Sequence, residues 1–398
     1  MKILVLTNLY PPHAYGGYEG SCRDVVVRWR AAGHDVTVLT SDERAPGVAD
    51  DPAEHGVERT LRWYWRYHEL LDPPARTRLA IERHDLRVIN DVLDRTRPDA
   101  VSVWNWGATP LSVLEVIAAR GIPIQIYLCN DWIGLSVALE PWLRAFARRS
   151  PLLGRAVTAL TRVPTKAPAM DRITSTVFVS ESTRRSNDSS GSWTWPDAPI
   201  VPLGVDLDEF PLATERPDSW SWRLLFVGRV DPPKGTVTAV RAFAALPQEA
   251  TLTMVGDGPA AHWTELQELA RELDVSDRLR REVLPRADVI REYDAADVCL
   301  FTSEWEEPFG IVPLEAMARG IPVIASGTGG SGEFLLDREN CLIAKPGEPE
   351  AWTAAIQALA GDAQLRARLR AGGYATAARL TMDATATLLE QHLETLVG

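Results

Sequence analysis

The sequence is poor in lysine, in paired cysteines and in long apolar runs. Nearly all of its 42 basic residues are arginine, because only Lys2, Lys166, Lys234 and Lys345 are lysine. The four cysteines are far apart and form no CxxC pair, so we expect buried reduced thiols and neither a disulfide framework nor a zinc site. No apolar run is long enough to span a bilayer, and the run at residues 3–7 is too short for a signal peptide.

Positive charge is also in deficit, since the formal net charge is −12. This balance argues against nucleic acid as a partner, because phosphate backbones need a broad cationic face. It leaves room for a small local phosphate pocket. The reduced thiols indicate a protein of the cytoplasm. The cysteine spacing offers no zinc site, so we expect no metal, and we expect no resident cofactor.

A chain of 398 residues exceeds one ordinary core, so two domains are expected. Apolar runs alternate with helical patterns, which indicates βαβ units and parallel sheets. Strands are predicted at 3–7, 35–40, 99–103, 122–128, 176–180 and 199–202, with helices at 21–32 and 110–120 and loops at 42–80 and 183–198. An Asp-, Pro- and Ser-rich stretch at 205–221 predicts the linker.

A second series of strands is predicted at 223–228, 251–255, 281–284, 297–302, 321–325 and 341–344. Residues 376–397 then have helical periodicity, with Ala378, Met382, Ala386, Leu389 and Leu393 near one face. The fold class is therefore α/β, with two Rossmann-like doubly wound domains. Such sheets bind ligands at the carboxyl ends of their strands, which predicts a cleft between facing domains.

The densest constellation is S-E-W-E-E-P-F-G-I-V-P-L-E-A-M-A-R-G-I-P at 303–322. Phe309 and Gly310 lead into a helix near Ile311, so backbone N–H groups there are free to face an anion. Glu307 and Glu315 flank these groups and are placed to hold hydroxyls on either side of a diphosphate. Taken singly, each glutamate is equally well explained as a solvated loop charge or a helix-dipole partner.

A second constellation, G-R-V-D-P-P-K-G at 228–235, follows the strand at 223–228. Arg229 offers a fork and Lys234 a point charge for phosphate oxygens. Two exposed loop cations are the ordinary alternative. The scarcity of lysine and the position at a strand end favour the phosphate role.

These motifs together resemble the retaining glycosyltransferases of the GT-B fold, in the large family 4 branch. Glu307 and Glu315 are similar to that family's E-x7-E motif, and residues 228–235 to its GR-x4-KG loop. VPLGVDLDEF at 201–210 resembles its inter-domain stretch, and PPHAYGGYEG at 11–20 its N-terminal glycine loop.

The resemblance implies roles for these residues. Glu307 would bind hydroxyls of the transferred sugar, Glu315 the ribose, and Arg229 with Lys234 the leaving diphosphate. The nucleobase would lie near Leu284 to Arg286. Residues 1–205 would form the acceptor domain, 206–375 the donor domain, and 376–398 a helix that returns to the first domain. Donor contacts are also implied for Gly16, Gly17, Gly228, Phe309, Gly310 and Ile311.

One position departs from the family pattern. The strand at 122–128 runs into Cys129, Asn130 and Asp131, where the family usually has a histidine near the reacting carbon. Asparagine transfers no proton but hydrogen-bonds sugar hydroxyls. We count Asn130 and Asp131 as candidate catalytic-site residues, with a helix cap as the alternative.

Aromatic residues suggest where an acceptor would bind. Fourteen tryptophans include the pairs Trp63/Trp65, Trp104/Trp106, Trp193/Trp195 and Trp220/Trp222. Trp104, Asn105 and Trp106 follow the strand at 99–103, so with Trp132 they are candidates to line the acceptor cleft. Core packing is the alternative. The acceptor would be a small molecule, a glycan or a lipid.

Residues 141–172 combine apolar residues with Arg144, Arg148, Arg149, Arg155, Arg162 and Lys166. Such a segment suits weak peripheral contact with an anionic membrane, at its cytoplasmic face, or else a solvated helix face.

The expected activity is transfer of a sugar from a nucleotide-diphosphate sugar, a UDP-sugar first and a GDP-sugar next, to an acceptor hydroxyl. An epimerase of the same fold and a non-catalytic binding protein are alternatives. A third is an NAD-dependent dehydrogenase, because Gly256-Asp-Gly258-Pro-Ala-Ala fits a dinucleotide fingerprint.

Overall fold

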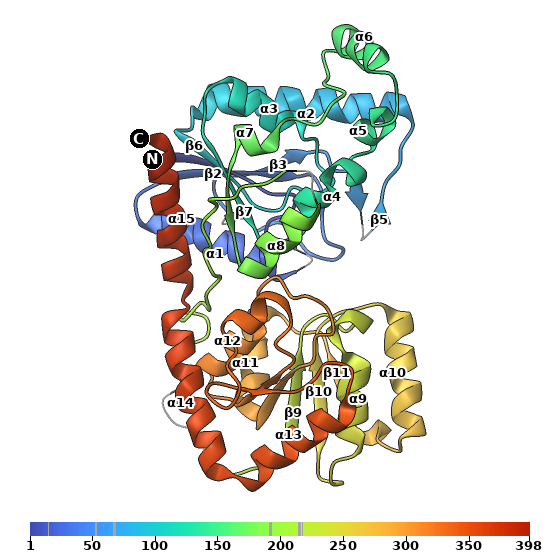
Figure 1. The fold of residues 1–398 in the computed structure, drawn as a ribbon, viewed down its shortest axis with the longest axis vertical. Helices are drawn as coiled ribbons and strands as arrows, with labels where there is room; N and C mark the ends of the chain where they lie inside the picture. The colour runs from blue at the N-terminus through green and yellow to red at the C-terminus, as the bar shows by residue number, and fades with distance from the viewer. Residues whose placement is uncertain (15, 52–53, 67–68, 191–192, 214–215, 217) are drawn as a thin grey trace. The chain divides into compact units, whose positions relative to one another are not determined.

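The computed structural model describes residues 1–398 except 15, 52–53, 67–68, 191–192, 214–215 and 217. The chain forms two compact units, Met1–Val201 with Thr385–Gly398 and Pro202–Ala384 (Figure 1). The sequence had suggested boundaries at 205/206 and 375/376. Each unit contains a six-stranded, all-parallel sheet, so the predicted pair of doubly wound α/β domains is confirmed.

The N-terminal unit has the strand order β3-β2-β1-β6-β7-β8. Its elements are β1 (Lys2–Leu6), α1 (Gly17–Ala31), β2 (Asp35–Ser41), β3 (Val57–Leu61), β4 (Trp65–Arg66), β5 (Glu69–Leu70), α2 (Ala75–Thr96), β6 (Ala100–Val103), α3 (Ser112–Ala119), β7 (Ile124–Leu128), α4 (Trp132–Leu139), α5 (Pro141–Phe146), α6 (Pro151–Thr161), α7 (Met170–Ile173), β8 (Ser175–Phe178) and α8 (Glu181–Ser190). Strands β4 and β5 form a separate antiparallel hairpin.

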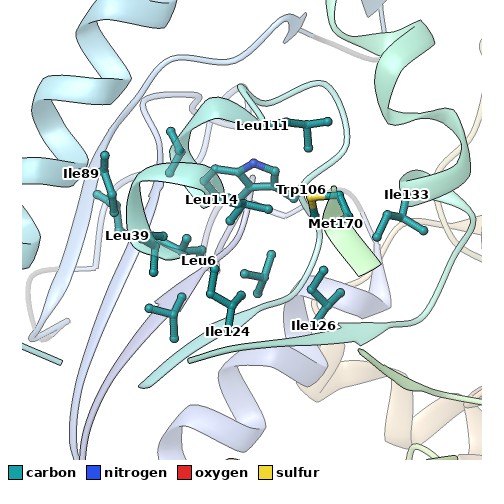
Figure 2. Close-up of a cluster of buried hydrophobic side chains, with 14 of the residues drawn as sticks. Leu6, Leu39, Ile89, Trp106, Leu111, Leu114, Ile124, Ile126, Ile133 and Met170 are labelled. Atoms are coloured by element: carbon teal, nitrogen blue, oxygen red, sulfur yellow. The ribbon is translucent and has the colours of Figure 1, made fainter. Parts of the chain in front are cut away.

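Alternation along the buried strands sends side chains to both faces of this sheet. Leu4 and Leu6 of β1 and Ile124 and Ile126 of β7 belong to one apolar cluster with side chains of α2 and α3. Figure 2 shows this cluster, with Trp106 lying among the aliphatic side chains. Helices therefore cover this face of the sheet, and its inner strands β1, β6 and β7 are almost entirely buried, as is usual for parallel sheets.

The opposite face of the N-terminal sheet carries the C-terminal helix α15 (Met382–Val397). The indole nitrogen of Trp29 donates to the backbone oxygen of Ala386 at 3.0 Å. Gln125 of β7 donates to the backbone oxygen of Leu389 at 2.9 Å. Ala386, Leu389 and Leu393 are buried, as their helical spacing predicted.

The predicted helix at 376–397 is divided, however. It contains the end of α14 (Ala363–Arg379) and all of α15, with a break at Leu380 and Thr381. The break has a physical cause, because Val205 pairs with Thr381 there: its N–H donates to Leu380 O, and Met382 N–H donates back to Val205 O, each at 2.9 Å.

The C-terminal unit has the strand order β11-β10-β9-β12-β13-β14. Its elements are β9 (Arg223–Val227), η1 (Pro232–Lys234), α9 (Thr236–Ala244), β10 (Thr251–Val255), α10 (Ala260–Glu272), η2 (Ser276–Arg278), β11 (Leu279–Glu282), α11 (Arg286–Ala295), β12 (Val298–Phe301), α12 (Val312–Ala318), β13 (Val323–Ala325), η3 (Gly329–Glu333), β14 (Leu342–Ile343), α13 (Pro349–Gly361) and α14. All six predicted strands of this half are present within two residues at either end.

Three expectations need correction. The regions 42–80 and 183–198 are not loops throughout, since they contain β3, the β4–β5 hairpin, the start of α2 and most of α8. Residues 199–202 form only an isolated bridge, between Ile200 and Phe178. The expected linker at 205–221 is anchored to the C-terminal unit, where the Arg216 guanidinium donates to backbone oxygens of α11 and its end.

Among the described residues, no helix combines the length and the apolar character needed to cross a bilayer.

Candidate functional site

The two motifs of the C-terminal unit meet at the carboxyl ends of β9 and β12, which are neighbours in the sheet. The Thr302 hydroxyl donates to Lys234 O at 2.7 Å, and the N–H of Glu304 donates to Pro233 O at 2.9 Å. Gly235 makes this approach possible: its φ is +66°, and a Cβ there would lie 2.0 Å from Thr302 O. The loop 228–235 is thus held against the start of the loop 302–311.

Lys234 and Glu307 form the central contact of this edge. The Lys234 Nζ lies 2.5 Å from the Glu307 Oε1, and the two side chains are 21% and 6% exposed. Lys234 also lies 5.3 Å from the centre of the Trp305 ring. Two motifs that are separated by 73 residues therefore place a cation and a carboxylate in direct contact. Phosphate oxygens and sugar hydroxyls are the groups that such a pair binds.

Arg229 is the second cation of the loop that follows β9. Its guanidinium pairs with the carboxylate of Asp231, two residues later. The arginine side chain is 53% exposed, whereas that of Asp231 is 9% exposed. The buried carboxylate therefore pairs with one side of the guanidinium, and the exposed part of the guanidinium lies at the strand end within reach of an anion. Gly228, just before it, has a φ of +139°.

Glu315 is buried in the first turn of α12 and has two partners. The Tyr293 hydroxyl donates to its Oε2 at 2.8 Å. Its Oε1 lies 2.9 Å from Nη1 of Arg286 in an ion pair that lacks hydrogen-bond alignment. This oxygen retains acceptor capacity for a hydroxyl.

Arg286 connects Glu315 to two residues that were not singled out from the sequence. Its Nε donates to Glu209 Oε2 at 2.7 Å, and its guanidinium lies 5.0 Å from the centre of the Phe210 ring. Glu209 and Phe210 belong to the stretch 201–210, so the resemblance quoted for that stretch was the available signal. Leu284 is half-buried between β11 and α11.

Backbone donors lie between the two glutamates. Helix α12 begins at Val312, as expected, after Ile311 at its N-cap. In the described part of the chain, the N–H groups of Phe309, Gly310 and Ile311 donate no hydrogen bond. Gly310 has a φ of +88°, and Phe309 is buried against Phe334 at 5.0 Å between ring centres. A buried phenyl ring and a left-handed glycine thus fix the loop that offers these donors.

The glycine loop of the N-terminal unit caps α1. Gly16 and Gly17 are exposed, and the N–H of Gly16 donates to Glu19 Oε2 at 3.0 Å. Helix α1 begins at Gly17, four residues before its predicted start, and the carboxylate of Glu19 at the third helical position bonds the N–H of the N-cap residue Gly16. Burial raises the pKa of Glu19 to about 7. Tyr15, within the same motif, lies outside the described residues.

Asn130 and Asp131 both lie at the start of α4. Asn130 lies just before the N-cap, and its Oδ1 accepts from the N–H of Trp132, the first residue of the helix, at 3.3 Å. Asp131 is exposed at the N-cap position and its side chain makes no capping bond. Neither side chain makes the N-cap bond to the second or third helical N–H, and the amide nitrogen of Asn130 is available for other partners.

The tryptophans expected to line an acceptor site are core residues instead. Trp104 and Trp106 are both fully buried, and Trp132 is 4% exposed. Trp104 packs edge-on against Tyr127 with 5.0 Å between ring centres. Asn105 is half-buried. A buried indole presents no face to a ligand, so the proposed acceptor role of Trp104 and Trp106 is wrong.

A different aromatic pair is partly accessible in the N-terminal unit. Trp63 and Trp65, beside and within the β4–β5 hairpin, stack with 6.5 Å between ring centres. The indole nitrogen of Trp63 donates to Gly107 O at 2.8 Å, which ties the pair to the loop after β6. These two residues have the same spacing in the sequence as Trp104 and Trp106, so the spacing does not distinguish the accessible pair from the buried pair.

The glycines of the dinucleotide-like stretch serve backbone packing. A Cβ at Gly256 would lie 2.0 Å from Gly228 O, and one at Gly258 would lie 2.1 Å from Val230 O. The N–H of Val230 donates to Asp257 O at 2.8 Å. These glycines therefore let the loop after β10 pack closely against the loop that contains Arg229. This packing explains their presence, so they need not indicate a dinucleotide site.

Two family models match the chain. Residues 15–209 match "Glycosyltransferase Family 4", and residues 214–376 match "Glycosyl transferases group 1". The two matches together run through nearly all of both units.

Curated relatives are glycosyltransferases. A D-inositol 3-phosphate glycosyltransferase of Xylanimonas cellulosilytica is 35% identical over 212 residues, which is 49% of this chain and 51% of the relative. The chain thus spans about half the length of that relative. A glycogen synthase of Mycobacterium tuberculosis is 29% identical over 96% of this chain and 91% of its own length.

Solved structures share the fold over the whole chain. A sucrose-phosphate synthase of Thermosynechococcus elongatus has a TM-score of 0.72 and 21% identity, covering 100% of this chain and 99% of its own. The Anabaena protein HepE, solved with UDP and glucose, has a TM-score of 0.72 and 20% identity, covering 99% and 100%. By both family models and by its fold, the chain belongs to the glycosyltransferases of the GT-B class.

Proposed function

We propose that this protein is a retaining, metal-independent glycosyltransferase that uses a nucleotide-diphosphate sugar as donor. The C-terminal unit holds the donor, and the acceptor hydroxyl belongs to a small molecule, a glycan or a lipid bound by the N-terminal unit. A UDP-sugar is the first choice of donor and a GDP-sugar the second.

The observation that carries the proposal is the contact of Lys234 with Glu307 at 2.5 Å, beside the free N–H groups of Phe309 to Ile311. Cation, carboxylate and backbone donors converge at the carboxyl ends of two adjacent parallel strands. That edge is where doubly wound sheets bind nucleotides.

The chemistry assigned to this edge is stabilisation of a leaving group. As the bond from the anomeric carbon to the phosphate oxygen breaks, its electron pair remains on the diphosphate. Lys234 and Arg229 lower the energy of that charge, because fixed cations act strongly in a site that excludes water. Glu307 accepts hydrogen bonds from hydroxyls of the transferred sugar and holds it in register.

The acceptor oxygen then forms its bond on the face that the diphosphate leaves, which retains the anomeric configuration. The acceptor proton passes to the departing phosphate oxygen. This route needs no protein base, which agrees with an asparagine, Asn130, at the position where the family usually has histidine. Asn130 would donate a hydrogen bond to a sugar hydroxyl.

The nucleoside is assigned to the other half of the same edge. Glu315 has an oxygen suited to a ribose hydroxyl, and Arg286 lies over Phe210 next to Leu284, where a base would lie. UDP ranks first because the structurally similar HepE was solved with UDP and with UDP-glucose.

The test is thermal unfolding with UDP, GDP, ADP, TDP and NAD, each with and without a chelator. A nucleotide at a hundred times its dissociation constant adds about 2.7 kcal/mol to stability. We expect a clear shift with one nucleoside diphosphate, undiminished by chelator. A shift with NAD alone, or none at all, would remove the donor-site assignment. A shift without release of nucleotide from the matching sugar donor would favour a non-catalytic binding protein, and release of nucleotide without glycosyl transfer would favour the epimerase.

A further inference from the structure

Helix α6 has an exposed apolar face in addition to the narrow face by which it contacts the N-terminal unit. Figure 1 shows α6 standing off the rest of the N-terminal unit, at the end of two connecting segments. Gly154 and Thr158 face inward: a Cβ at Gly154 would lie 2.9 Å from the Thr165 hydroxyl, and the Thr158 hydroxyl lies 3.1 Å from it. Val157 also packs against the apolar cluster of the unit, so small, polar and β-branched residues make the contact of α6 with the protein.

The opposite face of α6 is apolar and open. Leu152 is 73% exposed, Leu153 45% and Leu160 84%. At about 100° per residue, these three side chains and Ala156 fall within an arc of about 100°. Leu160 has the largest exposed fraction among the exposed large apolar side chains of the described residues. Isolated exposed leucines are ordinary, but a contiguous stripe on one helix marks a contact surface.

The surroundings of this stripe carry one sign of charge. Residues 141–170 contain six basic residues and no acidic one, in a chain of net charge −12. Arg148, Arg155, Arg162 and Lys166 are exposed, and within the described ranges none of them forms an ion pair. Their charge is therefore available to a partner.

We propose that α6 docks the protein on an anionic lipid bilayer, with Leu152, Leu153 and Leu160 inserted among the acyl chains and the basic residues at the headgroups. Charge complementarity selects this occupant, since an acidic protein has concentrated cations around this apolar stripe. A second copy of the chain would bring the same cations together and repel itself. With 11 residues, α6 is too short to span a membrane, so the contact is peripheral and reversible.

The experiment is sedimentation of the full chain with vesicles. We expect binding to vesicles of phosphatidylglycerol and phosphatidylcholine, little binding to pure phosphatidylcholine, and a decline as salt increases. The double variant Leu152→Ser/Leu160→Ser removes the apolar anchor and should weaken binding by about tenfold or more. A second double variant, Arg148→Gln/Arg155→Gln, should also weaken binding to anionic vesicles relative to the parent, because each basic residue near an anionic surface contributes about fivefold to affinity.

The matched control is Leu388→Ser, because Leu388 is 44% exposed on α15 of the same unit and lies away from the basic segment. Circular dichroism establishes that each variant is folded. Three results would overturn the proposal: no pelleting of the parent with anionic vesicles at low salt, equal pelleting of parent and leucine variants, or a dimer in sedimentation velocity that Leu152→Ser/Leu160→Ser dissociates. The last would assign the stripe to a second copy of the chain.

Discussion

The contact between Lys234 and Glu307 allows its structural and chemical roles to be separated. Three variants are needed: Lys234→Met, Glu307→Gln and the two combined. Each keeps the approximate volume of the side chain and removes its charge. The backbone anchor of the loop is untouched, because Gly330 N–H donates to the carbonyl oxygen of Glu307 at 2.6 Å and not to its side chain.

The expected loss of stability follows from burial. Breaking a buried ion pair by removing one partner costs about 3–5 kcal/mol, because the other charge is left unpaired. Lys234 is 21% exposed, so we expect the lower part of this range for Lys234→Met. The double variant removes both charges and leaves neither unpaired. Its loss of stability should therefore be smaller than the sum of the two single losses by about 1–3 kcal/mol.

Turnover should behave differently. Loss of one donor that stabilises a developing negative charge lowers kcat by about 100- to 1000-fold. Both variants that lack Lys234 should show this loss, and the double variant should not recover it. The assay is release of UDP from UDP-glucose, or of whichever nucleotide the ligand panel selects, together with urea unfolding of each variant.

Lys345→Met is the matched control, since Lys345 pairs with Glu348 on the surface of the same unit and is 70% exposed. It should change neither quantity appreciably, because exposed pairs contribute little. If the double variant recovers turnover together with stability, Lys234 is a structural partner of Glu307, and its role on the leaving group is refuted.

Three further predictions concern single residues. The pKa of Glu19 is about 7 in the folded chain, against 4.5 for an ordinary glutamate. The folded state therefore binds more protons than the unfolded state between pH 4.5 and 7, and the free energy of unfolding should fall as pH rises through this range. Glu19→Gln should reduce the slope of unfolding free energy against pH by up to about 1.4 kcal/mol per pH unit, measured by urea titrations. Gly235→Ala should lower the free energy of unfolding by more than about 3 kcal/mol, because φ is +66° and the new Cβ would lie 2.0 Å from Thr302 O. Gly347→Ala should lower it by only about 1–2 kcal/mol, because φ is +72° there but the space around the new Cβ is open. Glu315→Gln should reduce the preference for UDP over 2′,3′-dideoxy-UDP in calorimetry, and an unchanged preference would remove Glu315 from the ribose.

The sequence predicted the C-terminal unit better than the N-terminal one, for a physical reason. Strands β9, β10 and β12 are buried on both faces, so they appear as short apolar runs that need no partner to be recognised. The loops that follow them contain glycines whose close approaches exclude a side chain, as at Gly235 and Gly256. Local sequence therefore specified both the strands and the loops between them.

The N-terminal unit depends more on contacts that are distant in sequence. Trp104 and Trp106 directly follow β6, where ligand contacts are common, and only the packing of Tyr18 and Tyr127 around Trp104 reveals that its ring is buried. A distant contact within the C-terminal unit likewise makes the break before α15, because Val205 lies 176 residues earlier in the chain than Thr381. Neither contact has a signature in its own stretch of sequence.

The charges of the candidate donor edge explain how a strongly acidic chain can offer a diphosphate site. Each of the three cations described at this edge contacts a carboxylate: Arg229 with Asp231, Lys234 with Glu307, and Arg286 with Glu209 and Glu315. These three cations and four carboxylates leave no excess of positive charge without ligand, so the edge attracts phosphate only at contact range. Under the proposed function, a phosphate oxygen would replace the carboxylate as the partner of Lys234, and Glu307 would then be released to bind the sugar. In that case the ion pair stabilises the free site and couples diphosphate binding to placement of the sugar.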